Sequence, residues 1–115
     1  MKRVLFLLVL LAAPAAAAPP TTCGLQDDYS RALCAYQRRD FQQAERGFRA
    51  IVELGAQEPQ TIKSMYFLAR TMMKSGRFDA AAALFIRIHE ADRPFYDAWS
   101  CDFLLGECRR ALGKD

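Results

Sequence analysis

The apolar positions of the chain recur at the spacing of an amphipathic helix over most of its length. Between residues 62 and 98 a first stripe falls at steps of 0, +3, +4 and +7, and its members are Met65, Leu68, Ala69 and Met72. A second stripe follows the turn at 75–77, and its members are Phe78, Ala81, Phe85 and Ile88. The run Asp92-Arg93-Pro94 then ends the pattern. This segment predicts two antiparallel helices joined by a short turn, with Gly76 in the left-handed conformation that closes the first helix.

The same pattern returns at a step of 37 residues. Pairs of like residues lie one step apart: Phe41 and Phe78, Ala44 and Ala81, Phe48 and Phe85, Ile51 and Ile88. Two triplets continue the step toward the C-terminus: Ala32, Ala69 and Gly106, and Arg39, Gly76 and Gly113. We therefore expect full units at 25–61 and 62–98 and a partial unit at 99–115. The predicted fold is all-α, a short α-solenoid of antiparallel helix pairs with about two and a half units; the alternative is a plain four- or five-helix bundle.

The residue types at these steps resemble the tetratricopeptide repeat (TPR) family. The second unit carries the resemblance at Leu68-Ala69, Met72, Gly76, Phe78, Ala81, Phe85 and Ile88. The first and third units carry it at Ala32, Phe41, Ala44, Phe48, Ile51, Leu105-Gly106 and Gly113. The family's unit is usually about 34 residues, so each connection here is about three residues longer. The resemblance implies a stacked helical fold with close helix contacts at Ala44 and Ala81, and it specifies function poorly.

The first 18 residues have the form of a secretory signal peptide. A basic start is followed by an apolar run from Val4 to Ala13 and a tract of small residues from Ala15 to Ala18. This stretch is shorter than the ~20 residues that span a bilayer, so cleavage near Ala17 or Ala18 and export to the periplasm or medium are predicted. A retained signal anchor and a lipid-modified N-terminus at Cys23 are the alternatives. Residues 19–24 are then a short linker to the helical domain.

Removing the predicted signal peptide changes the charge of the chain. The remaining 97 residues hold 14 Lys+Arg and 13 Asp+Glu, so the formal net charge falls from +3 to +1. A chain this close to neutrality gives no electrostatic argument for binding nucleic acid. It is also short for a solenoid, whose units stabilise one another, so a covalent brace, a partner or an oligomer is expected.

Export would place the four cysteines in a compartment where disulfides persist. Cys23 and Cys34 are the preferred pair, because Gly24 allows the linker to fold back over the first helix. Cys101 and Cys108 are seven residues apart on one predicted helix, a rise of about 10.5 Å, which is too far for a disulfide between them. They would share one face of the last helix. That face is either covered by neighbouring side chains with both thiols reduced, or a docking face for another molecule.

The sequence contains no pattern that predicts catalysis. Glu45 with Glu53, and Asp92 with Asp97, are conceivable acid–base pairs, but all four occupy polar surface or connector positions. His89 falls at the end of a helix, where a cation suits the helix dipole. We therefore predict that the chain is not an enzyme and has no cofactor and no metal site.

The first helix of each unit lines the concave surface in the architecture that the resemblance implies. The residues at the corresponding positions are Tyr29, Leu33 and Tyr36, then Tyr66, Arg70, Met73 and Lys74, then Phe103, Glu107 and Arg110. Tyrosine, methionine, phenylalanine and arginine are enriched at protein interfaces, and Arg70 and Lys74 are spaced to meet one carboxylate. The alternative for these positions is an ordinary mixed surface.

The predicted function is accordingly that of a non-catalytic protein–protein interaction module, an adaptor or assembly factor of the bacterial cell envelope. It would bind another protein or a peptide in its concave groove. The alternative is a structural subunit of a larger envelope complex that docks through its C-terminal helix, at Cys101 and Cys108.

Overall fold

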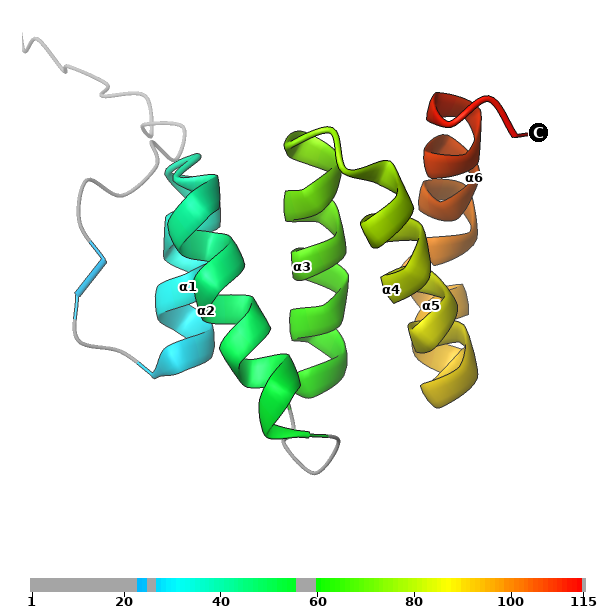
Figure 1. Ribbon diagram of the computed structural model, residues 1–115. Helices are drawn as coiled ribbons and strands as arrows, with labels where there is room; N and C mark the ends of the chain where they lie inside the picture. The colour runs from blue at the N-terminus through cyan, green and yellow to red at the C-terminus, as the bar shows by residue number, and fades with distance from the viewer. Residues whose placement is uncertain (1–22, 25–26, 56–59, 115) are drawn as a thin grey trace, which may run out of the picture.

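The computed structural model of the chain describes residues 23–24, 27–55 and 60–114. Over these ranges the chain forms helices and no strand (Figure 1): α1 Asp28–Gln37, α2 Phe41–Leu54, α3 Thr61–Lys74, α4 Phe78–Ala91, α5 Arg93–Ala98 and α6 Cys101–Ala111. The signal peptide predicted at 1–18 lies outside the described residues, as does most of the predicted linker. None of the described helices is long and apolar enough to cross a membrane.

The helices pack in series along the chain. The pair α1 and α2 forms the first unit, α3 and α4 form the second, and α6 begins the third (Figure 1). Neighbouring units meet where α2 packs on α3 and where α4 packs on α6. The all-α helical-repeat fold predicted from the 37-residue period is therefore confirmed.

Each unit closes its first helix with the same backbone turn. The residue in the left-handed region has a φ between 66° and 78° in all three units: Arg39, Gly76 and Gly113. The next amide donates a hydrogen bond of 2.7–2.9 Å to the carbonyl five residues back: Asp40 to Ala35, Arg77 to Met72 and Lys114 to Arg109. This is the hydrogen bond of a Schellman turn. The left-handed conformation predicted for Gly76 is confirmed, and the 37-residue step is a property of the backbone as well as of the residue types.

The connection between the second and third units contains the short helix α5, which the sequence analysis did not predict. The run at 92–94 ends α4 as expected, but it also starts the next helix. The Asp92 carboxylate accepts a hydrogen bond from the Phe95 amide at 3.0 Å, and Pro94 lies in the first turn, where proline is favourable. Ser100, at a φ of 56°, then redirects the chain into α6.

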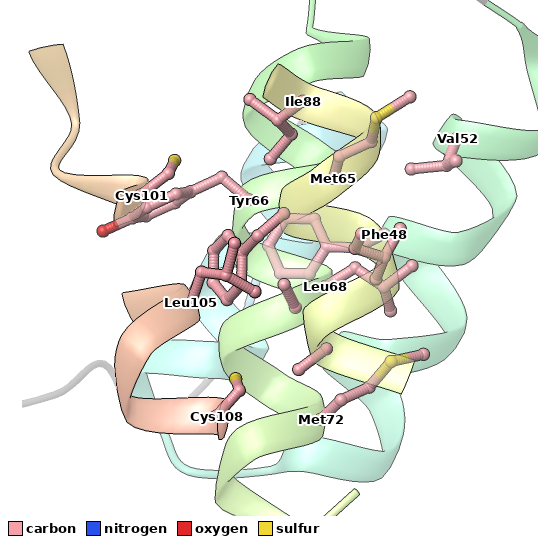
Figure 2. Packing of buried hydrophobic residues seen from close by; sticks show 14 of the residues in the cluster. Phe48, Val52, Met65, Tyr66, Leu68, Met72, Ile88, Cys101, Leu105 and Cys108 are labelled. Carbon is pink, nitrogen blue, oxygen red and sulfur yellow. The ribbon is translucent and has the colours of Figure 1, made fainter. Parts of the chain in front are cut away.

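The core is built from the apolar stripes that the sequence predicted. Figure 2 shows part of this cluster, in which α3 contributes Met65, Leu68 and Met72. The residues expected at close helix contacts and beside them have no exposed surface: Ala44, Ala81, Phe48, Phe85 and Ile88. Full burial of a phenylalanine or isoleucine side chain contributes about 1.5–3 kcal/mol, so these stripes supply the main stabilisation of the stack.

One ion-pair cluster connects the two full units across their surface. Glu45, on α2, accepts hydrogen bonds from both terminal nitrogens of Arg77, which precedes α4, and one of them is 3.1 Å long. Arg49 donates to the same carboxylate at 2.6 Å. The hydrogen bond from Arg77 lowers the pKa of the Glu45 carboxyl below its ordinary value, against the opposing effect of partial burial. The pair links residues 32 positions apart and thereby braces the first unit against the second.

Candidate functional site

A network of aromatic rings joins the first helices of the two full units to the junction between α5 and α6. Its centre is Phe67 on α3, whose ring centroid lies 5.1–6.5 Å from five others: Tyr66, Tyr36, Phe48, Trp99 and Tyr29. Trp99 stacks on Phe95 with a centroid distance of 4.6 Å. We call the half-buried rings of this network, Tyr29, Tyr36, Phe67, Phe95 and Trp99, the aromatic cluster.

The groove position predicted at Tyr66 on α3 is wrong, and the adjacent ring, Phe67, lies at the half-buried face instead. Tyr66, predicted to line the groove, is only 7% exposed and belongs to the core. Its neighbour Phe67 is half-buried and is the residue that joins the rings of α1 to Trp99. The 37-residue step gave no signal for Phe67, because the equivalent residues are Ser30 and Leu104. Phe67 is an aromatic residue at a position where the other units have none, and this departure from the repeat was the one sequence signal that could have identified it.

Arg70 lies at the edge of the aromatic cluster. Its guanidinium donates a hydrogen bond of 3.1 Å to the Tyr66 hydroxyl and lies 5.7 Å from the centroid of that ring. Burial lowers the pKa of Arg70, but the hydrogen bond to Tyr66 and the neighbouring Tyr36 outweigh it and raise the pKa above its ordinary value. Within the described residues Arg70 forms no ion pair with a carboxylate. It is therefore a half-buried cation whose charge has aromatic and hydroxyl neighbours and no carboxylate partner in the described part of the chain.

The structure brings together the predicted groove residues of the first two units but not those of the third. Leu33 and Met73 pack half-buried beside the core, and Lys74 is exposed in the last turn of α3. On α6, Phe103 is 62% exposed. Glu107 and Arg110 form an ion pair of 2.6 Å with each other. The predicted site thus reduces to a face formed by α1, α3 and Trp99.

Two surface hollows lie away from the aromatic cluster. One, of about 370 Å³, lies over α1 and α2 and is lined by Asp28, Arg31, Ala32, Gln43, Arg46, Gly47 and Ala50. The other, of about 490 Å³, lies at the end of α6 and is lined by Gly106, Arg109, Arg110 and Lys114. Arg110 is the one predicted groove residue that lines either of them.

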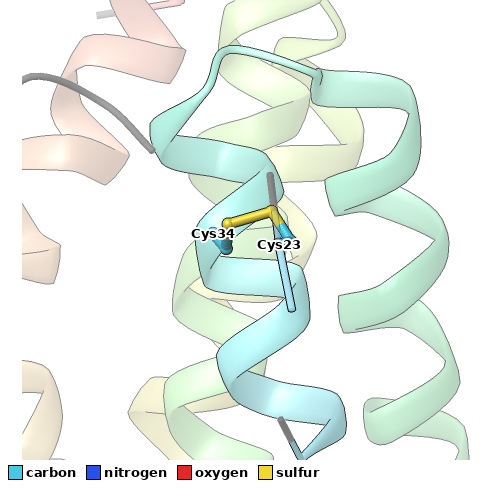
Figure 3. The surroundings of a disulfide bond; sticks show 2 residues. All are labelled: Cys23 and Cys34. Carbon is cyan, nitrogen blue, oxygen red and sulfur yellow. A yellow bond between two sulfur atoms is a disulfide. The ribbon is translucent and has the colours of Figure 1, made fainter. Parts of the chain in front are cut away.

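A disulfide joins Cys23 to Cys34, as predicted, with a Cα–Cα distance of 5.7 Å (Figure 3). Cys34 is equivalent, one and two steps along the repeat, to Thr71 and Cys108, which are fully buried. On α6 that face packs against the preceding unit, because α4 and α5 are the helices that α6 contacts. On α1 no described helix precedes it, and Cys34 is nevertheless only 7% exposed. The disulfide-linked residue Cys23 therefore lies on the face that a preceding unit would cover.

The docking face predicted at Cys101 and Cys108 is not a surface of the folded chain. Both side chains are fully buried and their thiols are free. With Leu105 they form the buried face of α6, whose main contacts are with α4, and Figure 2 shows all three side chains in the buried cluster. Burial raises the pKa of Cys101 to about 11, and burial together with Glu107 raises that of Cys108. Protonated, enclosed thiols are poor nucleophiles, so these cysteines act as small core residues.

Three of the four acidic residues considered for catalysis have structural partners instead, and the fourth, Glu53, is exposed on α2. Glu45 binds two arginines, Asp92 caps α5, and Asp97 forms an ion pair of 3.2 Å with Arg93. Over the described part of the chain, no three metal-binding side chains come together as a site for an ion. The aromatic cluster with Arg70 is the arrangement that is best suited to bind a ligand.

Comparisons with family models, with curated proteins and with solved structures return no match to this chain.

Proposed function

We propose that this chain is a non-catalytic protein–protein interaction module that binds a peptide segment over the aromatic cluster, with a carboxylate of the ligand at Arg70. The observation that carries the proposal is the half-buried Arg70 guanidinium, which has no carboxylate partner among the described residues. Burial opposes the Arg70 charge, and the neighbours that offset burial are tyrosines rather than an acid. A ligand carboxylate would supply the missing counter-ion in a place where the aromatic rings lower the local polarity.

The aromatic cluster supports binding of a protein chain through its chemistry. Tyrosine and tryptophan present large apolar faces together with a polar atom, and they lose little conformational entropy when a ligand covers them. Here Phe67, Trp99 and Phe95 already hold one another by ring contacts, so the surface is preorganised. Preorganisation leaves more of the interaction free energy for binding.

We place this function outside the cytoplasm, in the bacterial cell envelope. The support is the signal-like segment at 1–18 together with the Cys23–Cys34 disulfide, since such bonds persist in oxidising compartments. A periplasmic adaptor or assembly factor fits both features.

The alternative function, a structural subunit that docks through α6, loses the residues on which it depended. Its two cysteines are buried. At two equivalent repeat positions α3 has the buried residues Met65 and Met72. One step later, α6 has the exposed residues Asp102 and Arg109. A helix with a polar outer stripe resembles the terminal helix of a repeat stack, which solvates the end of the core. The interaction module is therefore the better-supported function.

Trp99, the only tryptophan of the chain, provides a direct test. The mature protein, with its disulfide intact, is used to select from a displayed library of random peptides with free C-termini. Selected peptides are then titrated while the Trp99 emission is followed. We expect the emission to change on binding, and Arg70→Gln to weaken affinity by about tenfold or more, the range for losing a hydrogen bond to a charged group.

Arg87→Gln is the matched control, because Arg87 is an exposed arginine on α4 outside the aromatic cluster. It should leave the affinity within about twofold. Failure to select any peptide that binds above background would refute the proposed function. Equal affinities of wild type and Arg70→Gln would refute the role of Arg70.

A further inference from the structure

The C-terminal end of α6 carries a concentration of positive charge that the proposed function does not use. Arg109, Arg110 and Lys114 are all exposed and line the hollow of about 490 Å³ together with Gly106. Gly106 has no side chain to fill this space. The nearest atom that a Cβ there would meet is a guanidinium nitrogen of Arg110, 3.7 Å away.

The positions equivalent to these cations have other roles in the second unit. One step earlier they are Met72, Met73 and Arg77, of which Met72 is buried in the core. Cations also flank the ends of the other first helices, with Arg38 and Arg39 after α1 and Lys74 and Arg77 at the end of α3. Two of these have described partners, since Arg77 binds Glu45 and Arg39 lies over the Phe41 ring, whereas the cations at the end of α6 line one hollow together. All three charged side chains that line the hollow are cations.

The backbone at this end does not repel an anion strongly. Three carbonyls of the last turns accept hydrogen bonds from amides that follow: Cys108 from Leu112 at 3.0 Å, Arg110 from Gly113 at 3.0 Å and Arg109 from Lys114 at 2.7 Å. The exposed negative end of the helix is thereby reduced. Among the described carboxylates, only Glu107 pairs with the cluster, through Arg110. Side chains in that pair are 57% and 43% exposed, and such pairs are weak enough to exchange for a better acceptor.

We propose that this hollow is a phosphate-binding site, independent of the peptide site at Arg70. The planar guanidinium groups of Arg109 and Arg110 match the oxygens of a phosphate group, and Lys114 adds a third donor. Two sources share this chemistry: inorganic phosphate and the phosphodiester headgroup of an anionic phospholipid. Phe103 is seven residues before Arg110 and therefore on nearly the same side of α6. Its 62% exposure would place an aromatic ring against a bilayer if the source is a lipid.

The test uses the mature, disulfide-bonded protein at low ionic strength. Inorganic phosphate is titrated calorimetrically, and sedimentation is measured with vesicles of phosphatidylcholine alone and of phosphatidylcholine mixed with phosphatidylglycerol. The test variant is Arg109→Gln with Arg110→Gln. The matched control, Lys63→Gln with Arg87→Gln, removes the same charge from exposed positions on α3 and α4. Circular dichroism confirms that both variants fold.

We expect the test variant to bind phosphate about tenfold more weakly than wild type and the control to bind as wild type does. If the source is a lipid, the protein sediments only with vesicles that contain phosphatidylglycerol, and the test variant has a partition coefficient about 25-fold lower than wild type. Phe103→Ser then lowers the partition coefficient further. If the source is free phosphate, the calorimetric difference appears without vesicle binding. Equal losses in test and control variants, or no binding of either probe by wild type, would overturn the proposal.

Discussion

The turn that closes the first helix of each unit provides a test of the repeat at the level of free energy. Its left-handed residue is glycine in two units, but it is Arg39, at a φ of 66°, in the first. A residue with a Cβ costs about 1–2 kcal/mol in this region, whereas glycine loses about 0.5–1 kcal/mol more backbone entropy on folding. The difference predicts that Arg39→Gly raises the free energy of unfolding by about 0.5–1 kcal/mol relative to a variant that keeps the Cβ.

The matched control separates backbone strain from side-chain contacts. The Arg39 guanidinium lies 5.3 Å from the centroid of the Phe41 ring, a contact worth about 0.5 kcal/mol at an exposed site. Arg39→Ala loses that contact and keeps the Cβ, so it should be slightly less stable than wild type. Gly76→Ala should lower the free energy of unfolding by about 1 kcal/mol. Backbone strain at a φ of 78° is the only cause, because no atom lies within 4 Å of an added Cβ.

Urea denaturation of the disulfide-bonded protein, followed by far-UV circular dichroism and by Trp99 fluorescence, measures these differences. The expected order of stability places Arg39→Gly above Arg39→Ala, and wild type above Gly76→Ala. If Arg39→Gly is no more stable than Arg39→Ala, the left-handed turn carries no strain and the reasoning is wrong.

Three further substitutions test other parts of the stack by the same denaturation assay. Replacing Cys23 and Cys34 by serine opens a loop with a sequence separation of 11, which should cost about 3 kcal/mol; an unchanged midpoint would contradict the role of the disulfide as a brace. Glu45→Gln should cost about 1 kcal/mol at neutral pH. Because the folded-state pKa of Glu45 is lowered, the deficit should persist as pH falls to the ordinary value of 4.5 and shrink only below it; a deficit independent of pH would exclude the ion pair with Arg77. Ser64→Ala should raise stability by up to about 1 kcal/mol, because the fully buried Ser64 hydroxyl has no hydrogen-bond partner among the described residues; a loss of stability would indicate a partner.

The sequence by itself was sufficient for the helical stripes and for the repeat. Burial of Phe48 and Phe85 and the turns at Gly76 and Gly113 follow from periodic, local patterns, because a helix places residues three and four positions apart on one face. The Cys23–Cys34 pair was also accessible, since Gly24 next to Cys23 allows the chain to turn back onto the first helix.

The short helix α5 shows where local patterns become ambiguous. Asp92 and Pro94 were interpreted as the end of a helix pair, yet the same two residues are favourable at a helix start. Local sequence contains the signal for both outcomes. Packing of Tyr96 and Trp99 against the core decides that the chain forms a helix here.

The residues that form the candidate site could be identified only with the tertiary structure. A stripe of residues such as Cys101 and Cys108 identifies one face of a helix but not the direction in which that face points. Whether Tyr66 or Phe67 is buried depends on the rings that α1 and Trp99 bring from distant parts of the chain. Periodicity along the chain determined which faces are apolar, and only the packing of the units decided which of those faces is covered, because coverage is set by neighbours that are far away in sequence.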